Sequence, residues 1–322
     1  MPDLPSISVV VPTYNRGHAL EAILRPLIDD PTARELIVVI DGSTDHSLQV
    51  VQALAGRDSR VRALPIANSG EMAAREAGAR TADSEIVLFL DDDVLAEPGL
   101  VAGHAARHAR GGADVVLGYM PVELAARPSP DDFATRIYAR EYEGRCRVYE
   151  EDQVSVLREL WAGNFSMRRE ACLAVGMPNP RYTARYHPDR DFGLRCLEAG
   201  LTGVFDSSLR ARHLHSRALP AFVRDARSQG AARVLMQELH AGRVPAVTGA
   251  EFERGLPAPA AHLVRLGRRR RAGAALSQAL MLGVRGAGRL RLWPAQRIAA
   301  RLLRRIEQQR GAIDQAQAIG HA

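Results

Sequence analysis

The sequence predicts an α/β fold in which helices cover a mostly parallel sheet. Short apolar runs alternate with stretches of helical periodicity about 10–15 residues long, a pattern typical of parallel strands joined by crossover helices. Acidic or polar residues directly follow three of the apolar runs. Since the carboxyl ends of parallel strands meet at one edge of a sheet, and ligands bind beyond that edge, these endings predict a binding site.

The individual elements follow from the same patterns. In the first part of the chain we expect strands at residues 7–11, 36–40, 61–64, 86–90 and 114–118. Pro12 is expected to end the first strand, and Asn15 to cap the helix after it. After a partly helical excursion over 121–157, we expect an extended segment at 161–167, helices at 169–175 and 189–199, and a short strand at 204–205.

The composition is that of an ordinary globular chain with one unusual region. The 322 residues suffice for one large or two small domains, with 46% hydrophobic and 25% charged residues. Residues 258–322 hold 13 Arg against Glu307 and Asp314, so this tail carries +11 and the remainder −5. The tail predicts a basic helix after Pro294, with Ile298, Leu302 and Ile306 on one side.

Cysteine usage and the ends of the chain bear on location. The three Cys have no metal-binding spacing and cannot all pair with one another, which favours a reduced compartment and a cytoplasmic protein. The first residues lack the pattern of a signal peptide. No apolar run approaches the roughly 20 residues that span a bilayer.

The strongest single feature is the strand at 86–90, which ends in Asp91, Asp92 and Asp93. Three like charges repel one another and lose solvation at such an edge, so a cation should share the site. Carboxylate oxygens without nearby Cys or His suit Mg²⁺ or Mn²⁺, and these ions usually bring phosphates. No Walker lysine loop and no GxGxxG follows a strand, so neither a P-loop NTPase nor a dinucleotide enzyme is indicated.

Four motifs occur in order along the chain, and together they resemble one family. They are residues 11–16, 41–45, 68–70 with Arg75, and 89–93. This series resembles the family-2 glycosyltransferases, inverting enzymes of the GT-A fold that use nucleotide-sugar donors. The resemblance is dense over residues 7–118 and looser over 161–215.

The resemblance implies a donor site. The loop from Pro12 to Tyr14 and Asp41 would hold the nucleotide base, Arg75 would lie near base and phosphates, and Asp91 would contact the ribose. Asp93, last of the DxD motif, would bind the divalent cation, Mn²⁺ or Mg²⁺. The donor-side residues that the resemblance implies are Pro12, Thr13, Tyr14, Arg16, Asp41, Asn68, Gly70, Arg75, Asp91 and Asp92.

The resemblance also implies a general base at the start of a helix. Asp189 matches the Asp that the family uses, although Pro188 stands where the family usually has Glu. A helix N-terminus lowers the pKa of a carboxyl, so burial must compensate if Asp189 is to be an effective base. The alternative is that Asp189 and Asp191 are only acids at a helix start.

Two further sites are implied. Trp161, Gly163 and Asn164 resemble the segment that lines the acceptor side, although Trp161 could equally be a core residue. His213 or His215 matches a histidine near the metal and diphosphate. On an extended segment these two residues point in opposite directions, so at most one faces the site, and we favour His213.

The predicted organisation is a GT-A domain at 1–220, an α/β, Rossmann-like mixed and mostly parallel sheet with flanking helices. Residues 1–118 form its nucleotide-sugar half and 119–220 its acceptor half, and an Arg-rich helical extension follows at 221–322. We expect transfer of one sugar, from a UDP-sugar, to a sugar or lipid-linked acceptor in glycan, glycolipid or polysaccharide biosynthesis. The Gln-x-x-Arg-Trp motif of processive members is absent, so a polymerase is not expected.

The tail leaves the partners open. A basic amphipathic helix suits an anionic membrane surface, which would make the protein peripheral at the cytoplasmic face. Packing on the catalytic domain or on a second subunit of a homo-oligomer is the alternative. No nucleic acid partner is expected. Two other functions stay open: a nucleotidyltransferase, which would normally show a Gly-rich phosphate loop, and an inactive protein that binds polyanions through its Arg-rich tail.

Overall fold

The computed structural model describes residues 4–320 and divides into two compact units. The sheet unit takes in the chain up to Glu123, together with Tyr142–Asn179 and Asp189–Leu214. The helical unit takes in Leu124–Glu141, Pro180–Pro188 and the chain from His215 onward. The chain leaves the sheet unit for the last time near the predicted boundary at residue 220. Because two earlier segments also belong to the helical unit, the units are not consecutive halves of the sequence.

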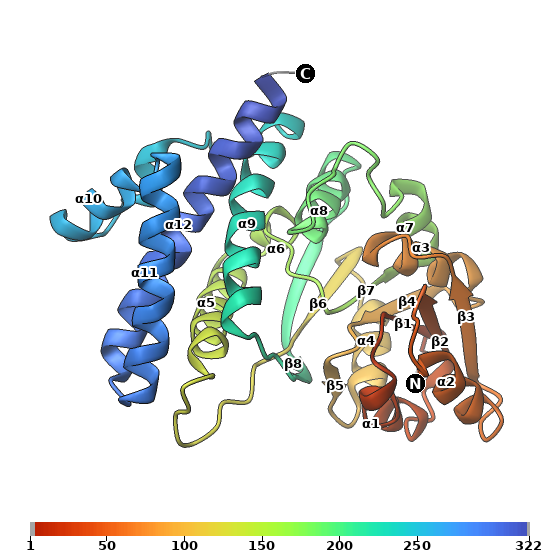
Figure 1. The fold of residues 1–322 in the computed structure, drawn as a ribbon. Coiled ribbons are helices and arrows are strands. Elements are labelled where there is room, and N and C mark those ends of the chain that lie inside the picture. Colours follow the sequence, from red (N-terminus) through yellow and green to blue (C-terminus); the bar gives the residue numbers. More distant parts are fainter. Residues whose placement is uncertain (1–3, 321–322) are drawn as a thin grey trace. The chain divides into compact units, whose positions relative to one another are not determined.

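Eight strands form one sheet in the order β3-β2-β1-β4-β7-β6-β8-β5 (Figure 1). Strands β1 to β4 are mutually parallel, β7 is antiparallel to β4 and β6, and β8 is parallel to β6 and antiparallel to β5. The sheet is therefore mixed, as predicted. The strands are β1 Ile7–Thr13, β2 Ala33–Asp41, β3 Val61–Ile66, β4 Ile86–Leu90, β5 Val94–Ala96, β6 Val115–Tyr119, β7 Asn164–Arg168 and β8 Gly203–His213.

Helices cover both faces of this sheet. Phe165 of β7 lies under the guanidinium of Arg75 on α3, with Cζ 5.7 Å from the ring centre. Its strand neighbours Asn164 and Ser166 bond to His104 of α4. Since successive side chains of a strand point to opposite faces, α3 and α4 lie on opposite sides of the sheet. The first eight helices are α1 Gly17–Ile28, α2 Ser47–Ala55, α3 Glu71–Thr81, α4 Leu100–Ala109, α5 Phe133–Glu151, α6 Ser155–Arg158, α7 Arg169–Val175 and α8 Pro188–Glu198.

Some boundaries differ from the prediction. Strand β1 continues through Pro12 to Thr13, where we expected Pro12 to end it. Pro12 pairs with Val39 of β2. The pairing of β1 with β4 ends two residues earlier, at Val10. The missing N–H of Pro12 therefore does not interrupt the pairing of β1 with β4. Strand β8 is also much longer than predicted, because it continues beyond 204–205 through a polar stretch to a second part in which buried and exposed residues alternate.

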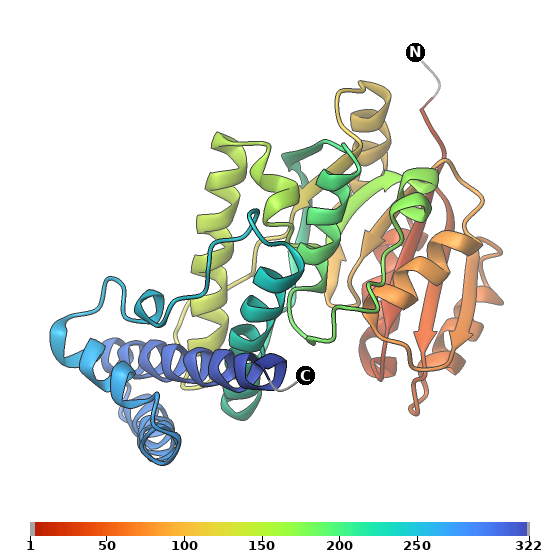
Figure 2. The same cartoon turned by 90° about the horizontal axis from the view of Figure 1, so that it is seen from above.

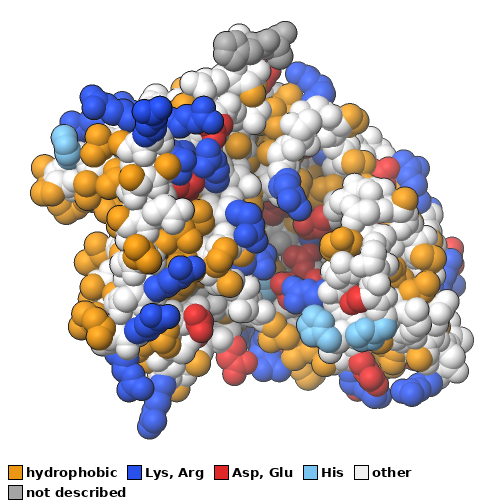
Figure 3. Space-filling view, viewed as in Figure 1, with side chains coloured by type: hydrophobic (Ala, Val, Ile, Leu, Met, Phe, Trp, Pro, Cys, Tyr) orange, Lys and Arg blue, Asp and Glu red, His pale blue; other side chains and the backbone are white. Residues whose placement is uncertain are grey.

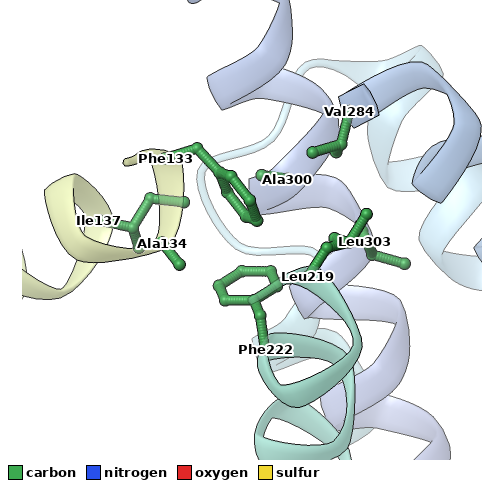
Figure 4. Close-up of a cluster of buried hydrophobic side chains, with 8 residues drawn as sticks. All are labelled: Phe133, Ala134, Ile137, Leu219, Phe222, Val284, Ala300 and Leu303. Carbon is green, nitrogen blue, oxygen red and sulfur yellow. The ribbon is translucent and has the colours of Figure 1, made fainter. Parts of the chain in front are cut away.

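In the helical unit, α12 packs along both α9 and α11 (Figures 1 and 2). Apolar side chains from α5, α9, α11 and α12 form one core around Phe133 and Phe222 (Figure 4). Phe252, Val264 and Ile306 belong to a second core. The elements of this unit after residue 214 are α9 Leu219–Leu239, η1 Gly249–Phe252, α10 Ala258–Leu266, α11 Arg270–Arg289 and α12 Trp293–Gly320.

The predicted apolar stripe of the last helix is not one exposed surface. Leu302 and Ile306 are buried in the second core, whereas Ile298 is exposed. Periodicity places these residues near one another on α12, but several neighbouring elements cover different parts of that helix. Within residues 4–320, none of the helices has both the length and the apolar character needed to cross a bilayer.

Two glycines let α9 and α12 approach closely. A Cβ atom added at Gly230 would lie 1.7 Å from the carbonyl oxygen of Gln308. One added at Gly311 would lie 1.9 Å from the carbonyl oxygen of Arg227. Since both obstacles are backbone atoms, the helices themselves would have to move apart to admit a methyl group.

We therefore expect Gly311→Ala to destabilise the protein by about 1–3 kcal/mol, the usual cost of overpacking. Gly286→Ala in α11 is the matched control, because a Cβ there meets no atom within 4 Å. The control should leave stability unchanged or raise it by up to about 1 kcal/mol, through helix propensity. Thermal unfolding followed by circular dichroism measures both, and equal midpoints for the two variants would show that the helices are not in tight contact.

Candidate functional site

The site lies where the strand order of the sheet reverses. From β1 the chain runs outward through β2 and β3 and then returns to β4 on the other side of β1. Ligands bind at such a switch point, beyond the carboxyl ends of the two adjacent strands. Here the end of β1 meets the acidic residues that follow β4, and Thr13 Oγ1 donates a hydrogen bond to Asp92 Oδ2 over 2.8 Å.

Arg16 supplies a positive charge to these acids. Its Nη2 lies 3.0 Å from Asp93 Oδ2, and its Nε lies 3.4 Å from Asp92 Oδ1. Burial raises the pKa of Asp92 to about 6, although Thr13 and Arg16 oppose the rise. The edge thus holds closely spaced carboxylates that one guanidinium only partly compensates.

Of the two histidines, the structure brings His213 to the acids. His213 ends β8, and its Nε2 lies 3.3 Å from Asp93 Oδ1. His215 belongs to the helical unit, where its ring stacks on Tyr138 with centres 4.1 Å apart. His213 is therefore the member of the pair that belongs to the sheet unit and contacts the acids.

The donor atoms at the edge fit a cation that arrives with a ligand. Within the described part of the chain, no group of three or more His, Cys, Asp or Glu residues is arranged to hold a metal ion. Asp93 and His213 together offer one carboxylate and one imidazole. Since Mg²⁺ commonly binds through one or two carboxylates plus substrate phosphates, this pair suits an ion whose other ligands come from a bound diphosphate.

Arg75 is the second cation of the site and is fully buried. Its Nη2 pairs with Glu71 Oε1 at 2.6 Å and also with Asp91 Oδ1. Burial alone would lower the pKa of Arg75, but the two carboxylates outweigh burial and raise it above the usual value. Burial raises the pKa of Asp91 despite this pairing. Arg75 therefore ties helix α3 to the end of β4.

Asp189 lies in the first turn of α8, as predicted. Its Oδ2 accepts a hydrogen bond from the N–H of Ala162 at 3.0 Å, and its Oδ1 accepts one from the N–H of Arg190 at 2.9 Å. Burial and the negative charge of Glu71 raise the pKa of Asp189 to about 6, against those bonds and the charge of Arg75. The residue is surrounded by protein yet still partly accessible to solvent. Burial thus outweighs the helix N-terminus, the condition that an effective base requires.

Asp191 has a different environment. It is buried, and it accepts hydrogen bonds from Asn179 Nδ2 and Arg195 Nε, each over 2.9 Å. Arg195 also donates to the backbone carbonyls of Val175, Gly176 and Met177. Asp191 therefore fixes the segment before α8, and the two acids at this helix start lie in different environments.

Asp41 orders the loop that leads into α3. Its carboxylate accepts hydrogen bonds from the N–H groups of Ser69, at 2.6 Å, and Gly70, at 2.9 Å. Asn68 Nδ2 donates to the carbonyl oxygen of Asp41. Gly70 has φ +88°, a conformation that favours glycine. The structure thus brings the predicted residues Asp41, Asn68 and Gly70 together at the end of β2.

The loop after β1 is tied to the loop after β2. Asn15 has φ +54°, and its Oδ1 accepts a hydrogen bond from the N–H of Thr44 at 2.8 Å. The prediction that Asn15 caps α1 is wrong, because Arg16 occupies the cap position and Asn15 bridges the two loops instead. The ring of Tyr14, next to Asn15, is exposed on this loop.

The residues predicted for the acceptor side divide into two kinds. Trp161 packs edge-on against Tyr142, with ring centres 5.5 Å apart, and stays partly exposed. Gly163 has φ +147°, and a Cβ there would lie 2.9 Å from Asp91 Oδ2. Glycine therefore allows the backbone to approach the acidic edge.

Asn164 is the exception. It is fully buried, its Oδ1 lies 3.0 Å from His104 Nε2, and its Nδ2 donates to the carbonyl oxygen of Leu209. Both ends of the amide are used inside the protein, so the structure gives no support to the predicted contact of Asn164 with an acceptor. The side chain instead joins β7 to α4 and β8.

Glu71 is a residue of the site that was not predicted from the sequence. This residue begins α3 and pairs with Arg75. The signal was present, because a Glu four residues before an Arg on a helix is a favourable ion-pair spacing, and Glu71 directly follows the Gly70 motif.

The sequence is similar to a known family and to curated proteins. The family model described as "Glycosyl transferase family 2" matches residues 8–171, just over half of the chain. Validoxylamine A glucosyltransferase of Streptomyces hygroscopicus subsp. jinggangensis is 40% identical over 121 residues, 36% of this chain and 28% of that protein. Glycosyltransferase GlyG of Streptococcus pneumoniae serotype 4 is 34% identical over 114 residues, 35% of this chain and 38% of that protein. The chain thus spans less than two fifths of the length of either relative.

Solved structures share the fold. A mannosyltransferase, PcManGT from Pyrobaculum calidifontis, superposes with a TM-score of 0.62 at 17% identity, covering 98% of this chain and 88% of that chain. S. aureus TarS 1–349 superposes with a TM-score of 0.51 at 15% identity, covering 92% of this chain and 90% of that chain. The predicted GT-A fold, with its helical C-terminal extension, is confirmed. With the family model matched over more than half of its length, the chain belongs to glycosyl transferase family 2.

Proposed function

We propose that the sheet unit transfers a single sugar from a nucleoside diphosphate sugar to an acceptor hydroxyl, with inversion at the sugar carbon. One observation carries this proposal: a carboxyl with a raised pKa, that of Asp189, belongs to the same charged group as the acidic edge of β4. Arg75 pairs with Asp91 of that edge, and its charge and that of Glu71 act on Asp189. Through Arg75, the proposed proton acceptor Asp189 is electrostatically coupled to the proposed donor-binding edge at Asp91.

The donor would lie along the ends of β1, β2 and β4. The exposed ring of Tyr14 and the loop ordered by Asp41 suit a nucleotide base, and Asp91 suits the ribose. Among the solved relatives, PcManGT is described in complex with GDP-Man and Mn²⁺, and TarS with UDP-GlcNAc. These descriptions support a nucleotide-sugar donor, and we propose that the donor is a UDP-sugar.

Asp93 and His213 would hold a divalent cation, Mn²⁺ or Mg²⁺, which stabilises negative charge on the departing diphosphate when bound. The chain's own contribution is to fix the ligands. The Asp93 carboxylate already lies against His213, and Arg16 is partly exposed, so its guanidinium can turn toward a phosphate.

Asp189 would accept the proton of the attacking hydroxyl. A pKa of about 6 leaves its carboxylate ionised at neutral pH, yet more basic than an ordinary Asp. Trp161, partly exposed beside Tyr142, offers an aromatic face on which an acceptor sugar could stack.

All three cysteines are free and buried, which supports a reduced, cytoplasmic setting.

The role of Asp93 predicts a specific loss. Asp93→Asn should reduce sugar transfer by at least about a hundredfold, because the variant loses charge stabilisation at the diphosphate. Excess chelator should do the same to the unchanged protein. Asp83→Asn is the matched control, since that carboxylate is exposed and makes only a 3.4 Å contact with Arg62. Release of nucleoside diphosphate from a panel of nucleotide sugars measures the effect, and full activity in chelator would exclude metal dependence.

Replacing Asp189 should affect turnover, whereas replacing Asp191 should affect stability. Asp189→Asn keeps the shape but removes the base, so kcat should drop by about 10²–10⁴ with little change in donor affinity. Asp191→Asn breaks a buried ion pair with Arg195 and should lower the free energy of unfolding by about 3–5 kcal/mol. Kinetics and thermal unfolding of both variants decide the matter. Normal kcat in Asp189→Asn, with a stably folded Asp191→Asn that is inactive, would reverse the assignment.

The pH profile reports the base. Asp189 must be ionised to accept a proton, so kcat/KM should rise with pH and level off above about 6. Asp92 has a similar pKa, but besides burial the main groups that perturb it are Thr13, Arg16 and Asp93. Glu71→Gln removes a negative charge that raises the pKa of Asp189, so the acidic limb should move to lower pH. If the acidic limb of the kcat/KM profile does not move in Glu71→Gln, a group other than Asp189 is responsible for it.

A further inference from the structure

The helical unit exposes an apolar face where α11 and α12 meet. Ten large hydrophobic side chains are exposed among the described residues, and four of them lie within the stretch 282–298. Those four are Leu282 at 66%, Leu290 at 72%, Leu292 at 52% and Ile298 at 68% exposure. Single exposed apolar residues are ordinary, but a group of this size indicates an interaction surface.

Two of the four side chains share one side of a helical hairpin, and the other two belong to the turn that joins its helices. Helices α11 and α12 run in opposite directions and are joined by a short turn at Leu290 to Leu292 (Figure 1). A Cβ at Gly283 would lie 4.0 Å from the Cβ of Ala299, so these two positions face each other across the pair. In an antiparallel pair, the residues that precede two facing positions turn to the same side. Leu282 and Ile298 therefore lie on one side of the hairpin.

Arginines surround these side chains and are not neutralised. Arg285 and Arg289 follow Leu282 at helical spacing, Arg297 and Arg301 flank Ile298, and Arg291 lies in the turn. All five are exposed, and within residues 4–320 none makes an ion pair. Residues 254–306 contain no Asp or Glu. Figure 3 shows apolar and basic side chains side by side over α10 and α11.

Other arginines of the same unit behave differently. Arg304 pairs with Glu141 at 2.6 Å, and Arg310 pairs with the buried Glu307. These residues serve the packing of the unit, which accounts for part of the charge of the tail. The five unpaired arginines serve no such role, so their charge is available to a partner.

We propose that this hairpin face, made of Leu282, Leu290, Leu292, Ile298, Arg285, Arg289, Arg291, Arg297 and Arg301, binds the surface of a membrane containing anionic phospholipids. The apolar side chains would enter the boundary between headgroups and acyl chains, while the guanidinium groups contact lipid phosphates. A second copy of the chain fits less well, because a dimer through this face would bring like charges together. The face lies outside the sheet unit, so the proposal does not rest on the transfer reaction.

The test uses the full chain and sedimentation with large unilamellar vesicles. One set of vesicles is phosphatidylcholine alone, and the other contains phosphatidylglycerol as well. We expect binding only to the anionic vesicles, weakening at high salt as exposed charges are screened. Each arginine near such a surface contributes about fivefold in partitioning, so Arg285→Gln/Arg289→Gln/Arg297→Gln should bind about a hundredfold more weakly.

Two further variants complete the design. Leu282→Gln/Leu290→Gln/Leu292→Gln/Ile298→Gln should lose binding at least tenfold while keeping its thermal unfolding midpoint, because none of the four is buried. Arg34→Gln/Arg110→Gln/Arg147→Gln removes the same charge from exposed positions of the sheet unit and should bind as the unchanged chain does.

Three results would overturn the proposal. They are equal binding to neutral and anionic vesicles, equal loss in the hairpin and control arginine variants, and unchanged binding in the leucine variant. If the leucine variant instead converts a dimer to a monomer in light scattering, without any vesicle binding by the unchanged chain, the hairpin face is an interface between copies.

Discussion

The guanidinium of Arg75 carries its charge in a fully buried position, and the acidic edge of the sheet is built around it. It holds Glu71 at the start of α3 and Asp91 at the end of β4, and its charge acts on Asp189. Arg75 is fully buried, so removing a paired carboxylate would leave an undercompensated charge inside the protein, although the Glu71 side chain itself is half exposed. The consequence is that the carboxylates are already arranged before a ligand arrives.

The edge nevertheless holds more acids than arginines. Arg75 and Arg16 face Glu71 and the three carboxylates from Asp91 to Asp93. In this setting burial prevails, and it raises the pKa of Asp92 to about 6. An excess of carboxylates would repel a diphosphate, which is why the donor site that we propose includes a cation. Burial and the charge of Glu71 also raise the pKa of Asp189, so the proposed donor site and the proposed base share one electrostatic environment.

Local sequence predicted the sheet and its acidic edge because buried strands and their polar ends are contiguous in the chain. What it could not predict depended on packing between distant elements. Asn164 was itself predicted for the acceptor side, yet the alternation of β7 turns it toward His104 on α4. Likewise, periodicity grouped Ile298 with Leu302 on the last helix. Only the placement of the neighbouring helices shows that Leu302 is core and that Ile298 is exposed.

The central claim is that cation and nucleotide diphosphate need each other at this edge. Calorimetric titration of the full chain with Mn²⁺, in the absence and presence of UDP or GDP, tests it most directly. We expect weak Mn²⁺ binding alone, with the preferred nucleotide raising that affinity at least about tenfold, and an equal gain when nucleotide is titrated into protein with Mn²⁺. Tight Mn²⁺ binding without nucleotide, or nucleotide affinity that is the same with and without Mn²⁺, would contradict the account.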